Sequence, residues 1–178
     1  MMETFNSFLE GLESTLRMLS SVLSVAYMIT NFLFIGLLVG TYRRPAFVRF
    51  ILFLIFLGAA FFNTRTALNT PWVYQNFADH AIAPYRTFIL GTFEAIIQPM
   101  VWSIALGQVF IAVTTLMKGH WHRLGCLSGI LFSLCIAPLG LGAAFPAPLI
   151  LAATFYQLYR QQEYSTPTSP HKEKSPNF

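Results

Sequence analysis

Six side chains in or beside apolar segments are the candidates for chemistry in this chain. Polar groups at membrane depth are costly, so a polar side chain found there is a candidate for function. The candidates come from two distant segments: Asn63, Arg65, Glu94, Gln98, Trp102 and Gln108. Amide, guanidinium and carboxylate groups of this kind suit hydrogen bonding to the polar end of a ligand. The sequence therefore predicts a ligand-binding site here and no catalytic residue.

Helical spacing connects most of these candidates. If a helix begins slightly before Pro99, residues 94, 98, 102, 105, 108, 112 and 115 share one face of it. One interpretation is packing, because hydrogen bonds between membrane helices contribute roughly 0.6–2 kcal/mol each. The other is a small cavity, open to the outer side, in which these groups meet a ligand headgroup. Phe-rich walls would then hold an apolar body such as a quinone or a sterol. An Arg65–Glu94 ion pair would serve either interpretation, because it would neutralise both charges near the interface.

Motifs for self-contained hydrolysis are absent from the sequence. It has no Gly-rich phosphate loop, HExxH, GxSxG or paired carboxylates. His120 and His122 flank Trp121 and are interpreted as anchors at the membrane interface, so no metal site is predicted. Cys126 and Cys135 are nine positions apart, which places them on opposite faces of a helix and indicates two unpaired packing residues. We expect no cofactor other than a bound quinone or lipid.

The composition indicates an all-α, polytopic membrane protein. Hydrophobic residues make up 55% of the chain and charged residues 10%, against roughly 25% charged in soluble domains. The apolar runs predict five transmembrane helices, at about 18–42, 46–66, 99–117, 124–143 and 146–160. Between them, residues 67–98 predict short helices at the outer surface, in a position to cap the bundle. Residues 1–17 predict an interfacial helix or an extension of the first span, and residues 161–178 a disordered tail.

Small residues recur at helical spacing in two of these spans. Gly36 and Gly40 form a GxxxG pair, which allows close approach of a neighbouring helix. Gly125, Gly129 and Ser133 recur at every fourth position and predict a second packing stripe.

The positive charges predict the orientation. Five passes place eight of the eleven Lys and Arg residues on one side and leave Arg17, Arg65 and Arg86 on the other. The positive-inside rule then puts the N-terminus outside and the C-terminus in the cytoplasm. Because the net charge of +4 is scattered between apolar segments, no nucleic-acid partner is expected.

Residues from about 47 to 160 resemble the DoxX-like integral membrane protein family. The stretches that carry the resemblance are Leu106-Gly107-Gln108, Lys118-Gly119, Arg123-Leu124-Gly125 and Ala137-Pro138-Leu139-Gly140. The resemblance implies a four-helix core with one extra N-terminal helix. It also implies relatives of which some are linked to quinone or thiol redox systems. Gln108 stands where the family pattern commonly has Glu, so a proton-linked role of that carboxylate is in doubt for this chain.

Two functions are compatible with this pattern. The first is a non-catalytic accessory or structural subunit, in contact with membrane lipids and other membrane-protein subunits. The alternative is a binding or redox-accessory protein for a lipophilic molecule, quinone-like or sterol-like, held within the helix bundle.

Overall fold

Helices form all the regular secondary structure of the described chain. This computed structural model describes the backbone of residues 2–164 and the side chains of residues 23–161. In chain order the elements are α1 (Met2–Arg43), α2 (Pro45–Asn69), the 3-10 helix η1 (Pro71–Asp79), α3 (Ala83–Ile89), α4 (Thr92–Leu116), α5 (His120–Ile136), the 3-10 helix η2 (Ala137–Ala143) and α6 (Ala147–Tyr164). The predicted all-α class is confirmed for this part of the chain.

Four segments are long and apolar enough to cross a membrane. They are Leu23–Arg43, Pro45–Asn69, Thr92–Leu116 and His120–Ala143, and they are compatible with an integral multi-pass membrane protein. The last of them continues from α5 through η2. α6 is not among the candidate spans found in the described residues, and its sequence becomes polar from Arg160 onward. Four of the five predicted spans thus have a matching apolar helix.

One helix boundary agrees with one of the two alternatives expected for residues 1–17, and a second differs from the sequence-based expectation. The backbone of residues 2–17 belongs to α1, so this stretch continues the first helix, while its predicted amphipathic side chains lie outside the description. Pro99 does not begin a helix, because α4 starts at Thr92 and is kinked at Ile96, where the backbone is non-helical. A proline lacks the N–H that would bond four residues back, which explains a kink in the preceding turn. Residues 165–178 of the predicted tail lie outside the description.

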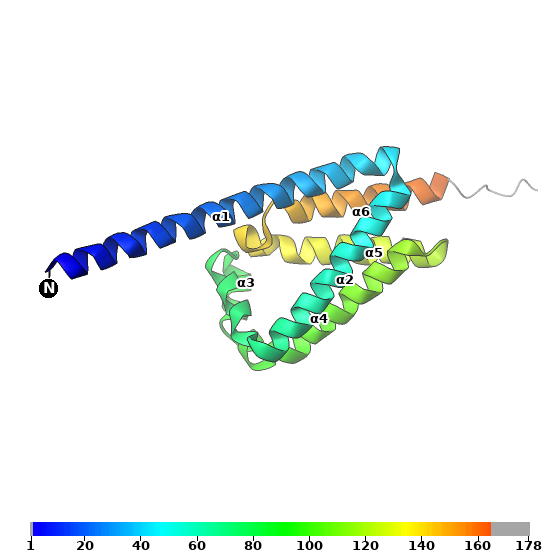
Figure 1. Ribbon diagram of the computed structural model, residues 1–178. Coiled ribbons are helices and arrows are strands. Elements are labelled where there is room, and N and C mark those ends of the chain that lie inside the picture. Colours follow the sequence, from blue (N-terminus) through cyan, green and yellow to red (C-terminus); the bar gives the residue numbers. More distant parts are fainter. Residues whose placement is uncertain (1, 165–178) are drawn as a thin grey trace, which may run out of the picture.

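The helices form two groups that are inclined to each other (Figure 1). One group holds α6 with α1 and α5 as neighbours, and the other holds α2 and α4 side by side. The groups meet where α1 is followed by α2 and α4 by α5. We call this the basic end, because Arg43, Arg44, Lys118 and Arg160 lie there. At the opposite end the groups diverge.

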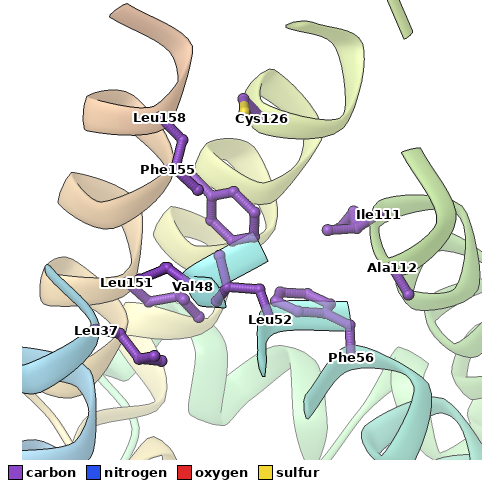
Figure 2. Close-up of a cluster of buried hydrophobic side chains, with 10 residues drawn as sticks. All are labelled: Leu37, Val48, Leu52, Phe56, Ile111, Ala112, Cys126, Leu151, Phe155 and Leu158. Carbon is purple, nitrogen blue, oxygen red and sulfur yellow. The ribbon is translucent and has the colours of Figure 1, made fainter. Parts of the chain in front are cut away.

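A hydrophobic cluster fills the region near the basic end, where the groups meet. Figure 2 shows the side chain of Phe155, from α6, pointing between α5 and α2. The ring of Phe56, from α2, lies 5.5 Å from the rings of both Phe155 and Phe132, in edge-to-face geometry. Such aromatic pairs contribute roughly 0.5–1.5 kcal/mol beyond the area that they bury. The cluster therefore holds the two groups together.

The diverging end is closed by a cap that consists of η1, α3 and η2. The Ile82 N–H donates to the Pro138 carbonyl at 3.1 Å, which joins the turn before α3 to η2. Gly140 lies against the His80 carbonyl with φ +63°, and a Cβ at Gly142 would lie 2.9 Å from the Phe77 ring. η2 can approach η1 this closely because both positions are glycine. In Figure 1 the α3 segment stands between the far end of the α2–α4 pair and the end of α5.

The predicted small-residue positions have different surroundings. A Cβ at Gly40 would lie 2.9 Å from Val48, and one at Gly125 would meet Thr114 of α4. At Gly129 the added atom would lie 2.6 Å from the Phe155 ring, and Ser133 is fully buried. These positions make close contacts. Gly36 has no neighbour within 4 Å among the described residues and makes no such contact.

Replacing Gly129 with alanine is expected to lower the stability of the bundle by roughly 1–3 kcal/mol, the range for overpacking. The new methyl group would overlap the Phe155 ring, which lies between α5 and α2. Thermal unfolding of the purified chain in detergent measures the effect. Gly36→Ala is the matched control and should leave the melting temperature unchanged or raise it, because alanine favours helix. Equal losses in the two variants would contradict the packing role of Gly129.

Candidate functional site

A cavity of about 520 Å³ lies beneath the cap. Three of the candidate membrane spans, α2, α4 and α5, form its walls, and η1, α3 and η2 lie over it. Its volume falls in the range of roughly 300–1,000 Å³ that is typical of small-molecule sites. Six aromatic rings line it: Tyr74, Phe77, Tyr85, Phe88, Phe93 and Phe132. Most of the other lining residues are aliphatic, so the cavity suits an apolar molecule.

The polar groups of this cavity form one hydrogen-bonded chain. The Tyr74 hydroxyl, on η1, donates to Asn63 Oδ1 at 2.9 Å. Asn63 Nδ2, on α2, donates in turn to Gln108 Oε1 on α4 at 2.8 Å. Burial raises the pKa of Tyr74, so its hydroxyl stays protonated and remains a donor at neutral pH. These two hydrogen bonds connect η1 of the cap to α2 and α4, which form one wall of the cavity.

Gln108 is the last residue in this series of hydrogen bonds. Its side chain is only 4% exposed and lines the cavity. Its amide oxygen accepts from Asn63, and its Nε2 donates to no acceptor among the described residues. This nitrogen is not among the fully enclosed polar atoms, so its N–H groups are accessible to a hydrogen-bond acceptor within the cavity.

The structure brings together two of the six predicted site residues, Asn63 and Gln108. Arg65 lies in a separate surface depression beside Phe61 and Leu68. Glu94 is exposed and does not line the cavity, and Arg65 and Glu94 form no ion pair with any described residue. The two charges expected in the site therefore lie outside it.

The other two predicted residues also lie outside the cavity. Gln98 is exposed, and its Nε2 donates to the Ala67 carbonyl at 3.2 Å, which ties α4 to α2. Trp102 is exposed as well, because a one-residue step from the buried Val101 rotates about 100° around the helix. The predicted stripe is buried at residues 105, 108, 112 and 115 and exposed at 94, 98 and 102.

Sequence reasoning places short helices over the bundle but does not assign their aromatic residues, or Cys135, to the site. The structure adds Tyr74, Tyr85 and Phe88 to the cavity lining, and the density of aromatic residues between 72 and 93 is the signal that could have indicated them. Cys135 had been interpreted as a packing residue. It is exposed and lines the cavity, whereas Cys126 is fully buried, and both cysteines are free. Among the described residues no group of three His, Cys, Asp or Glu side chains could hold a metal ion.

A second polar cluster lies at the basic end. The Thr115 carbonyl, near the end of α4, accepts from Arg49 Nε at 2.7 Å and lies 3.0 Å from His122 Nδ1. A guanidinium Nη2 of Arg49 also donates to the Met117 carbonyl. On α5, Cys126 Sγ lies 3.4 Å from His122 Nε2. These contacts satisfy backbone groups where α4 ends, and we interpret the cluster as structural.

Among the described residues the site thus offers an aromatic and aliphatic enclosure with an accessible amide donor at Gln108 and a free thiol at Cys135. Comparisons with family models, with curated proteins and with solved structures find no match to this chain. The resemblance to the DoxX-like family stays a prediction.

Proposed function

We propose that this protein binds a lipophilic small molecule that carries a hydrogen-bond acceptor. The observation that supports the proposal is the unpartnered amide N–H of Gln108 in a cavity of otherwise mostly apolar lining. A few well-placed polar groups in an apolar pocket are typical of sites that orient a ligand. Of the two functions expected from the sequence, the geometry favours the binding protein.

The chemistry of the cavity favours a ring ketone or quinone over other apolar molecules. The aromatic lining suits a flat ring, because offset stacking and edge contacts with aromatic side chains stabilise it. A quinone carbonyl accepts hydrogen bonds and donates none, which matches the recorded direction of the Tyr74–Asn63–Gln108 chain. A sterol hydroxyl can also accept from Gln108, and it forms the second class of candidate.

Gln108→Leu tests the proposal. Binding of a short-chain quinone to the purified chain is expected to weaken roughly 5- to 100-fold, because the buried ligand carbonyl loses its donor. A hydrocarbon analogue of the same ring and chain should bind both proteins equally. Gln98→Leu, the same change on the same helix outside the cavity, is the matched control and should leave quinone affinity unchanged. Equal quinone affinity of wild type and Gln108→Leu would overturn the proposal.

The accessory-subunit function remains a second candidate because of the surface of α1. Large apolar side chains such as Met28, Ile29 and Phe32 are exposed along its membrane-spanning part. Lipid alone would cover such a face, and so would a partner helix. Purification from native membrane in mild detergent distinguishes the two: a stoichiometric partner chain supports a subunit, and a lone chain with bound lipid contradicts it.

We further propose a five-pass topology with the basic end in the cytoplasm. α6 packs against both α1 and α5 and ends beside the end of α1, where Gln161 Nε2 donates to the Thr41 carbonyl at 2.8 Å. A helix in that position crosses the same thickness as its neighbours, although its composition is more polar. The basic end then carries the inside charges, which agrees with an outside N-terminus and a cytoplasmic C-terminus.

A further inference from the structure

We infer that the cavity opens sideways into the bilayer at Cys135 and takes up its ligand from the lipid phase. The inference rests on the proposed function for the identity of the occupant, but the opening itself is a separate claim. Cys135 is exposed at the surface of the chain and also lines the cavity. The lining residues that are exposed, and therefore lie where the cavity meets the outside, are Phe88 on α3, Cys135 on α5 and Gly142 on η2.

The outside at this point is hydrocarbon. Leu127, Leu131 and Leu134, on the same helix, are all large apolar side chains that are exposed. At 1.5 Å per residue, Cys135 lies about 22 Å along the helix axis from His120 at the basic end. The apolar core of a bilayer is about 30 Å thick, so this position falls within it and not at the water interface.

Helix α3 forms the other side of the opening. Phe88, on α3, is exposed and lines the same cavity. The Tyr85 hydroxyl donates to the Cys135 carbonyl at 3.0 Å, so α3 is held beside α5 at this level. The lateral opening is therefore framed by Tyr85, Phe88 and Cys135.

A route through the cap would have to separate more contacts. The Ile82–Pro138 hydrogen bond and the close approach of Gly140 to His80 would both have to break. The exposed side chains of the cap and its connecting turns combine Trp72 with the charged Asp79 and Arg86, a mixture that suits the membrane interface. Passage from the lipid phase leaves these contacts intact.

This geometry specifies the ligand class further. The acceptor group would bind at Gln108, on the buried side of the cavity, while a hydrocarbon tail extends through the lateral opening into the bilayer. The ligand is then a membrane-dissolved amphiphile with a compact carbonyl-bearing head. Lengthening the tail beyond the opening should change its affinity little relative to its concentration in the membrane, because the added carbons stay in lipid in both states.

Photo-crosslinking in vesicles tests the opening without reference to the ligand. The full chain is reconstituted in phosphatidylcholine that carries a diazirine on its acyl chain, and adducts are mapped by mass spectrometry. We expect adducts at Ile104 and Gln108, which line the cavity, as well as at the lipid-facing Leu106. Cys135→Trp should abolish the adducts at Ile104 and Gln108 and keep the adduct at Leu106. Leu131→Trp, an exposed position one turn away that does not line the cavity, should keep all three.

Two further results complete the test. Phe88→Ala should widen the opening and increase the adducts at Ile104. Cavity adducts that are absent in wild type, or unchanged in Cys135→Trp, would overturn the lateral opening. Such a result together with quinone binding that depends on Gln108 would leave the proposed function standing. If the cavity adducts form but Gln108→Leu leaves quinone affinity unchanged, the lateral opening is supported and the proposed function is contradicted.

Discussion

Replacing Gly140 with alanine should detach the cap from the bundle and weaken ligand binding together with stability. Gly140 has φ +63° and ψ −132°, a conformation that residues with a Cβ rarely adopt. A methyl group at this position would also collide with the His80 carbonyl, which is backbone and cannot rotate away. Strain and overlap together should cost roughly 3 kcal/mol or more. Because η1 and η2 both line the cavity, its closure should be lost as well.

Two measurements on the same preparation check this result: thermal unfolding in detergent and affinity for a short-chain quinone. Gly58→Ala is the matched control, because Gly58 is helical and has no neighbour within 4 Å among the described residues. Alanine at that position should raise stability by up to about 1 kcal/mol through its helix propensity and leave affinity alone. A Gly140→Ala protein as stable as Gly58→Ala would show that the cap does not depend on this contact.

Arg49→Ala should be the most damaging single change at the basic end. The guanidinium of Arg49 donates to the carbonyls of Thr115 and Met117 at the end of α4. Carbonyls at a helix C-terminus have no partners within the helix, and a cation there also complements the helix dipole. Hydrogen bonds to charged groups contribute roughly 1.5–3 kcal/mol each, so losing both should cost about 3 kcal/mol or more.

The comparison variants for Arg49 separate charge from geometry. Arg44→Ala removes an exposed charge close by in the sequence and should change the melting temperature little. Arg49→Lys keeps the charge but not the planar fork of donors, so its stability should fall between those of wild type and Arg49→Ala. If Arg49→Ala unfolds at the same temperature as Arg44→Ala, the two hydrogen bonds contribute nothing measurable to the fold.

The long helices could be predicted from the sequence because their signal is local. An uninterrupted apolar run of sufficient length specifies a spanning helix, and four such runs have matching helices in the structure. The helix start expected at Pro99 was wrong because proline is also tolerated inside a helix at the cost of a kink, here at Ile96. Local patterns do not distinguish a helix start from a kink of this kind.

The site could be predicted only in part because it depends on pairing across the fold. Asn63 and Gln108 were identified by the cost of polar groups at membrane depth, but their mutual hydrogen bond joins residues 45 positions apart and has no sequence signature. Glu94 and Trp102 meet the same criterion and lie outside the cavity, since exposure depends on small rotations around α4. The role of Cys135 was not predictable, because a cysteine in an apolar run indicates packing equally well.

Because the two helix groups are inclined and meet only near the basic end, a small rotation there corresponds to a larger displacement at the cap. Near the basic end the ring pair of Phe56 and Phe155 joins the two groups, and the groups diverge toward the cap. α4 has 25 residues and is therefore roughly 37 Å long. A rotation of about 3° about the basic end would move its far end by about 2 Å, which is more than half the thickness of an aromatic ring. A rotation of this size would change the width of the cavity and strain the contacts between Gly140 and His80 in the cap, while the ring contacts near the basic end would change little.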